Sequence, residues 1–203
     1  KLRSSKKLAS FSSGVVISYV VLNLLPEITS GVLIDGRKLF LYALFGFAAL
    51  NLIEQFIYKE VGRGRNIPSY HKKIHIIYFF IYNFAVGLVL VNFAARGFTQ
   101  TMLFFVPFLL YIVAEMLPQQ FEFKSELFKA LYFMAPVFGA FTGLLYLDFT
   151  MLIFGELLSF ITGTLLYSVI RESLPSDKAE KPFYFMIGAL FYTLLILLTW
   201  NLI

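Results

Sequence analysis

Residues 74–95, IHIIYFFIYNFAVGLVLVNFAA, form the stretch that decides the fold of this chain. The stretch contains no lysine, arginine, aspartate or glutamate. A helix needs about 20 mainly apolar residues to cross the hydrocarbon core of a bilayer. The stretch meets that length, so it predicts a transmembrane helix.

Six further apolar runs repeat this pattern along the chain. Short segments rich in glycine, proline and charge separate them, among them EITSGVLIDGRK at residues 27–38, and none is long enough for a soluble domain. The sequence therefore predicts an all-α, polytopic membrane helix bundle that forms a single domain over residues 1–203. Its seven transmembrane helices are expected at residues 8–25, 38–58, 74–95, 99–118, 127–147, 150–171 and 182–203.

The composition agrees with a lipid bilayer as the partner of this chain. Hydrophobic residues make up 59% and charged residues 14%, whereas a soluble domain carries about 25% charged residues. The chain has no cysteine, which excludes disulfides and thiolate metal sites. Its net charge is +5, but the basic residues lie in the connecting segments rather than on one amphipathic face, so nucleic acid is not an expected partner.

The lysines and arginines predict an orientation. If the connecting segments alternate between the two sides, 14 of the 17 basic residues lie on the same side as the N-terminus of this chain. The other three are Arg37, Lys38 and Arg96. Because cytoplasmic loops carry an excess of lysine and arginine, we expect the N-terminus of this chain in the cytoplasm and its C-terminus outside.

Polar residues at membrane depth are costly and point to function. Asn83 is followed one turn later by Gly87, and both share a helix face with Tyr82. A small residue on that face lets a neighbouring helix approach closely. Gly139 and Gly143 form a second small-residue pair, for which we expect ordinary packing within the chain.

The stretch YIVAEMLPQQFEF at residues 111–123 places an acid beside a helix breaker. Glu115 and Gln119 are four residues apart, and Pro118 frees the backbone carbonyl near Ala114. In lipid that carbonyl needs another partner, so this part of the helix should face protein or water. Two interpretations stay open: a functional site, or an ordinary kink with Glu115 hydrogen-bonded to a neighbouring helix.

Other polar residues have plainer interpretations. Glu54 is expected to snorkel toward the cytoplasmic interface, and Glu156 lies either near the outer interface or paired within the bundle. His71 and His75 have the spacing of a metal site on one helix face, but the neighbouring lysines favour a basic juxtamembrane segment. No zinc-hydrolase motif, nucleophile elbow or phosphate-binding glycine loop is present in the sequence, so an enzyme is not expected.

Four stretches in order resemble the ZIP family of divalent-metal transporters. SSGVVISYVVLNLLPEI (12–28) resembles the second helix of that family, which ends in a leucine-proline-glutamate turn. YNFAVG (82–87) and EMLPQQ (115–120) are similar to its fourth-helix and fifth-helix metal motifs. GTLLYSVIRESLP (163–175) is similar to its seventh helix. The family has eight helices with both termini outside, so the resemblance implies a ZIP-like fold without its first helix, together with a homodimer.

The ligands depart from the pattern of the family. Tyr82 and Val86 replace the histidine and the acid of the fourth helix. Aligned on Pro118, Glu115 replaces the fifth-helix histidine; a shift of one residue instead matches Ala114 and Glu115 to the family's His-Glu pair. The resemblance implies Asn83 and Glu115 as metal ligands. The implied transport-site residues are Tyr82, Asn83, Gly87, Glu115, Pro118, Gln119 and Gln120.

The resemblance implies transport of a divalent cation such as zinc, iron or manganese as the substrate, with no resident cofactor. One carboxylate with amides and a tyrosine is a poor zinc site and suits a hard cation held through water, or no metal at all. Two alternatives stay open. The chain is a non-transporting relative with a structural or regulatory role, or it moves another solute along Tyr82, Asn83, Gln119 and Gln120.

Overall fold

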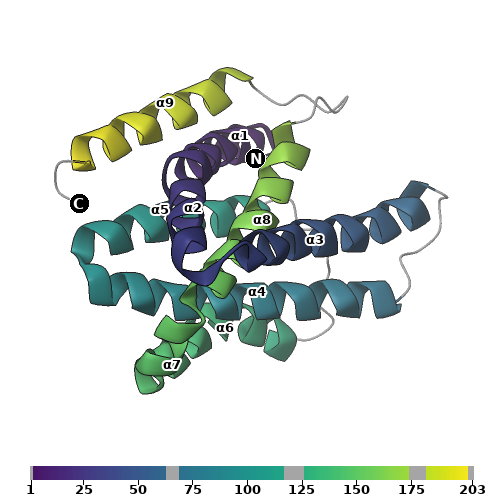
Figure 1. The fold of residues 1–203 in the computed structure, drawn as a ribbon. Coiled ribbons are helices and arrows are strands. Elements are labelled where there is room, and N and C mark those ends of the chain that lie inside the picture. Colours follow the sequence, from purple (N-terminus) through teal and green to yellow (C-terminus); the bar gives the residue numbers. More distant parts are fainter. Residues whose placement is uncertain (1, 63–68, 117–125, 174–181, 201–203) are drawn as a thin grey trace. The chain divides into compact units, whose positions relative to one another are not determined.

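The computed structural model describes residues 2–62, 69–116, 126–173 and 182–200, and every regular element in those ranges is a helix (Figure 1). This confirms the predicted all-α class. The elements are α1 (Leu2–Tyr19), the π-helix η1 (Val20–Leu24), α2 (Leu25–Asp35), α3 (Lys38–Gly62), α4 (Ser69–Arg96), α5 (Phe98–Met116), α6 (Glu126–Leu145), α7 (Leu147–Leu152), α8 (Phe154–Ser173) and α9 (Pro182–Thr199).

Four of the described helical stretches are long and apolar enough to cross a membrane. They are Lys7–Asp35, Lys38–Phe56, Ile76–Arg96 and Pro182–Thr199. The predicted spans at 99–118 and 127–147 contain shorter apolar helical stretches, Phe98–Val113 and Met134–Leu145. The structure therefore supports four candidate membrane spans, and the total of seven transmembrane helices stays a prediction.

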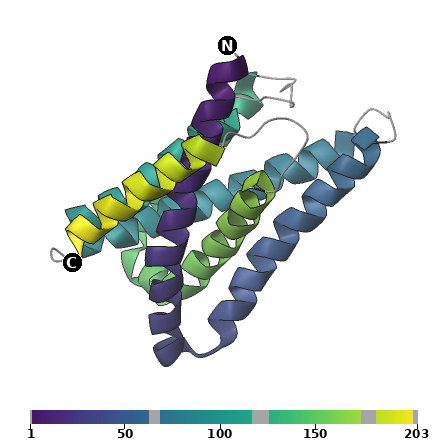
Figure 2. The same ribbon diagram turned by 90° about the horizontal axis from the view of Figure 1, so that it is seen from above.

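The predicted loop at residues 27–38 is wrong, because the first helix continues to Asp35. Figure 2 shows α1, η1 and α2 as one continuous helical rod in the purple part of the chain. In η1 the hydrogen bonds widen to five residues, so that the Leu25 N–H donates to the Val20 carbonyl. Pro26 then falls in the first turn of α2, where a missing N–H is tolerated. The helix ends at Gly36, whose φ of 78° suits glycine.

The predicted span at residues 150–171 is also not one helix. Tyr146 and Ile153 have non-helical backbone angles, with φ of −126° and −102°, and they bound the short helix α7. The long helix of this region begins only at Phe154. The order of apolar residues in the sequence does not reveal this break, because Ile153 is as apolar as the residues beside it.

The chain divides into two compact units, each described by itself. The first unit contains 1–36, 93–120 and 165–203, and the second contains 37–92 and 121–164. In the first unit α1 packs against α9 through glycines from both helices. A Cβ on Gly14 would lie 2.1 Å from the Phe185 carbonyl oxygen, and a Cβ on Gly188 would lie 2.2 Å from the Phe11 carbonyl oxygen. Ser18 Oγ adds a hydrogen bond to the Ala189 carbonyl at 3.0 Å.

In the second unit, two helix pairs also touch through glycines. Gly46 of α3 meets the Phe160 carbonyl of α8, and Gly163 of α8 meets the Ala43 carbonyl of α3. Gly87 of α4 likewise meets α6, whose Gly139 meets the Phe84 carbonyl. Small residues let membrane helices approach to backbone contact. Gly143 touches the Val91 side chain, so the predicted packing role of Gly139 and Gly143 within the chain is confirmed.

Candidate functional site

Asn83 is a buried amide in the candidate span of α4. Its side chain is 4% exposed, and its Nδ2 donates to the Phe79 carbonyl at 2.8 Å. Its Oδ1 has no hydrogen-bond partner within the described part of the chain. A buried acceptor left without a donor costs about 1–3 kcal/mol. Asn83 therefore offers a desolvated oxygen that a cation or a water molecule would satisfy.

The surroundings of Asn83 are close-packed. Tyr82 is fully buried, and the Phe79 ring meets the Tyr82 ring edge-on with centroids 6.2 Å apart. One turn after Asn83, a Cβ on Gly87 would lie 2.1 Å from the Pro136 carbonyl oxygen of α6. The predicted close approach of a neighbouring helix at Gly87 is thus confirmed, and that helix is α6.

Asn92 is a second buried amide in the same helix. It is 2% exposed, its Nδ2 donates to the Leu88 carbonyl at 3.0 Å, and its Oδ1 also has no partner among the described residues. Asn92 follows Asn83 by nine residues, which at about 100° per residue puts the two on opposite sides of the helix. The two amides therefore do not form one site.

The other predicted site residues lie partly outside the described residues. Pro118, Gln119 and Gln120 fall outside them entirely. Glu115, His71 and His75 have described helical backbones in α5 and α4, but their side chains lie outside the described part. Asn83 belongs to the second unit and Glu115 to the first. That the two share a site stays a prediction.

The register of α5 against α8 is set by buried contacts in the first unit. Tyr111 Oη donates to Ser168 Oγ at 3.0 Å, and both side chains are buried. Phe108 and Leu165 line one small packing gap. Both pairs are separated by 57 residues, so α5 and α8 run parallel. One helical turn beyond Tyr111 and Ser168, the same separation of 57 residues pairs Glu115 of α5 with Glu172 of α8.

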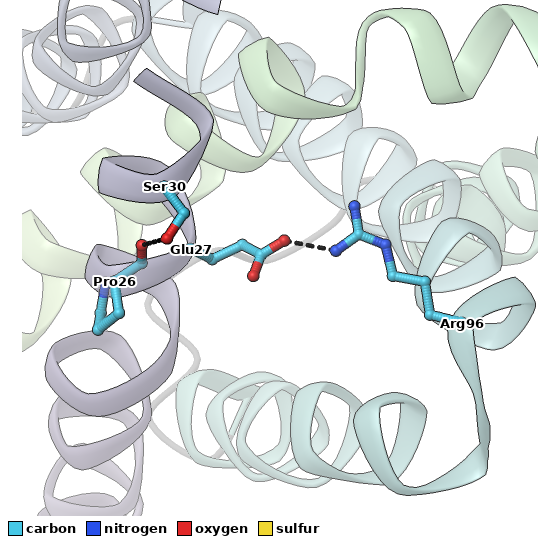
Figure 3. Close-up of polar contacts among 4 residues, drawn as sticks. All are labelled: Pro26, Glu27, Ser30 and Arg96. Atoms are coloured by element: carbon cyan, nitrogen blue, oxygen red, sulfur yellow. Dashed lines mark hydrogen bonds and ion pairs between the residues drawn. The ribbon is translucent and has the colours of Figure 1, made fainter. Parts of the chain in front are cut away.

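Two ion pairs add contacts that the sequence did not predict. Lys38 Nζ lies 2.8 Å from Glu156 Oε1 at the start of α8, and the lysine side chain is half exposed, so Glu156 is paired while its depth in the membrane stays a prediction. Glu27 of α2 pairs with Arg96 at the end of α4, and Figure 3 shows the carboxylate directed at the guanidinium. The sequence gives only a weak indication of either ion pair, namely that residues of opposite charge lie beside the ends of two predicted spans.

Glu54 corrects a further prediction. Its side chain is only 6% exposed, so it does not snorkel to the interface. Neighbouring side chains on α3 explain the difference: Leu52 and Phe56 are exposed, whereas Leu50 is fully buried on the side that packs. Glu54 follows Leu50 by one turn and shares that buried side.

Acidic and imidazole groups do not gather in the part of the chain that the structure describes. No three His, Cys, Asp or Glu residues within it lie close enough together to hold a metal ion. Among the described residues, the buried acceptor atoms without a hydrogen-bond partner include the amide oxygens of Asn83 and Asn92 and the second carboxylate oxygen of Glu156. Comparison of the chain with protein-family models, with curated proteins and with solved structures finds no match.

Proposed function

We propose that this chain is a ZIP-like integral membrane transporter that moves a divalent cation along α4 and α5. The observation that carries the proposal is the Asn83 Oδ1 atom, which is buried in a candidate span and has no donor among the described residues. Polar side chains at membrane depth that face the interior of a helix bundle are typical of substrate and ion pathways. The finer topology of seven spans, with the N-terminus of this chain inside, belongs to the same proposal.

The chemistry of the acceptors favours a hard cation. Magnesium, manganese and calcium take oxygen ligands, including side-chain amide carbonyls, carboxylates and water. Asn83 Oδ1 is such a ligand, and its Nδ2 is held by the Phe79 carbonyl, which orients the amide. Zinc prefers histidine and thiolate ligands. The proposed substrate class is therefore a divalent cation bound through oxygen.

The register of α5 against α8 supports a role for carboxylates in transport. Glu115 and Glu172 occupy equivalent positions on two neighbouring parallel helices, one turn beyond the bond between Tyr111 and Ser168. Two carboxylates would balance the charge of one divalent cation. Glu172 thus joins Glu115 as a proposed residue of the pathway.

Flux into proteoliposomes tests the proposal. The wild type, Asn83→Ala, Glu115→Gln and Glu172→Gln variants are assayed with zinc, cadmium, iron, manganese and magnesium. Asn51→Ala is the matched control, because the Asn51 Oδ1 already accepts a hydrogen bond from Gln55 Nε2 at 3.0 Å. We expect manganese or magnesium flux that falls at least tenfold in the three site variants and stays within twofold of wild type in the control.

The opposite result has a definite meaning. If folded wild-type protein carries none of these metals, the proposal is wrong, and the two alternatives left are a non-transporting membrane protein and a transporter of another solute. If flux occurs but is the same in all variants, the pathway does not use Asn83, Glu115 or Glu172.

A further inference from the structure

The joint between α1 and α2 is locally weak. In η1 the hydrogen bonds span five residues instead of four, as in the bond from the Leu25 N–H to the Val20 carbonyl. Pro26, two residues after η1, has no N–H, so one carbonyl of the preceding turn loses its helical donor. π-helical turns and prolines are the usual places where a long helix bends.

The two sides of this joint differ, because only the α1 side is fixed to a neighbouring helix. On the α1 side, Gly14 lies against the α9 backbone and Ser18 is bonded to the Ala189 carbonyl. On the α2 side, Thr29 Oγ1 donates to the Leu25 carbonyl at 2.6 Å and Ser30 Oγ donates to the Pro26 carbonyl at 3.0 Å. Bonds from Ser or Thr to the carbonyl four residues earlier favour a slight bend of the helix, so bending concentrates in η1 and the first turn of α2.

The outer face of α2 is open, and one ion pair ties the helix to the end of α4. Leu33 and Ile34 are 88% and 87% exposed, the highest values among the exposed large apolar side chains of the described residues. Glu27 pairs with Arg96, and both side chains are about two-fifths exposed, so neighbouring side chains do not enclose the pair (Figure 3). Beside it, Ile28 is buried.

The predicted span at residues 8–25 puts this ion pair at the membrane boundary, although the apolar helical stretch itself continues to Asp35. Counted from Lys7 at about 1.5 Å per residue, a core of about 30 Å ends near Pro26. The candidate span of α4 ends at Arg96 itself. The part of α2 beyond Glu27 therefore leaves the hydrocarbon, where a change of direction costs little.

We propose that α2 is a hinged arm that bends at η1 and is held closed by the Glu27–Arg96 ion pair. Opening of the pair lets α2 turn while α1 stays packed on α9. A turn of about 20° moves Ile34, about 15 Å beyond η1, by about 5 Å. This conformational device is independent of the proposed transport.

Paired spin labels in the full chain test the arm. The chain has no cysteine, so Ile34→Cys and Phe98→Cys, both highly exposed and both in the first unit, supply two defined labels. The distance distribution is measured by pulsed electron resonance in nanodiscs. Glu27→Gln or Arg96→Gln is expected to add a population whose distance is shifted by up to about 5 Å. The charge swap Glu27→Arg with Arg96→Glu is expected to restore the original distribution.

Two further variants distinguish an effect of the Glu27–Arg96 ion pair from a general loss of helix packing. Lys38→Gln breaks the other ion pair, to Glu156, and should leave the distribution unchanged. Pro26→Ala restores a backbone N–H and should reduce the shifted population in the Arg96→Gln background. The inference is overturned if the Glu27 and Arg96 variants keep the wild-type distribution, or if the charge swap does not reverse their effect.

Discussion

Gly87→Ala adds one methyl group where α4 and α6 touch through their backbones. The new Cβ would lie 2.1 Å from the Pro136 carbonyl oxygen and 2.7 Å from the Ala140 nitrogen. Ordinary contact begins at 3.4 Å, so the helices must separate by about 1.3 Å at this point. The obstacle is backbone, which cannot rotate away as a side chain can.

The separation lowers the free energy of unfolding. Overpacking of this kind costs about 1–3 kcal/mol, and the helix propensity of alanine over glycine returns up to about 1 kcal/mol. Because van der Waals packing is a main force between helices in a bilayer, we expect Gly87→Ala to destabilise by about 1–2 kcal/mol. Gly139→Ala moves the same two helices apart, so the double variant should lose less than the sum of the two single losses.

Reversible unfolding in mixed detergent micelles, followed by circular dichroism, measures these differences. Gly143→Ala is the matched control, because its added methyl group lies 3.2 Å from Val91 Cβ, so the neighbour must shift by only a few tenths of an ångström. We expect the control to stay within about 0.5 kcal/mol of wild type. Equal stability of Gly87→Ala and Gly143→Ala would refute the argument from backbone contact.

Two further substitutions test the polar interior. Asn83→Leu removes a buried oxygen, Oδ1, that has no donor among the described residues, so we expect it to raise the free energy of unfolding by about 1 kcal/mol while abolishing the proposed cation flux. Destabilisation in the same micelle assay would show that Oδ1 has a structural partner. Tyr111→Phe and Ser168→Ala each remove one end of the 3.0 Å bond between α5 and α8. A double-mutant cycle of the two should give a coupling energy of about 0.5–1.5 kcal/mol, and a coupling near zero would contradict the assigned register.

The helices at the middle of the chain follow directly from hydrophobic length. α4 begins at Ser69 and ends at Arg96, around the predicted span at 74–95, because a long apolar run between charged ends has few alternatives in lipid. The break at Ile153 and the continuation through Pro26 could not be predicted in this way. Both depend on local hydrogen bonding, which apolar residues do not encode.

The candidate site was predictable only in part. Asn83 and Gly87 could be selected because an amide and a glycine stand out in an apolar helix. Their partners could not, since contact with Pro136 depends on how two distant helices align. The ion pairs of Glu27 and Glu156 were missed for the same reason: each joins residues far apart in the sequence.

Among the described residues, three helix pairs touch through their glycines, and the order of these pairs along the chain has a consequence for biosynthesis. In sequence order they are nested: α4 with α6 innermost, α3 with α8 around it, and α1 with α9 outermost. During synthesis α6 emerges soon after α4, whereas α1 must wait until α9 has been made. Each inner pairing shortens the loop that the next one has to close, which lowers its entropic cost. The nascent chain should therefore assemble from its middle outward, with the glycine face of α1 uncovered the longest.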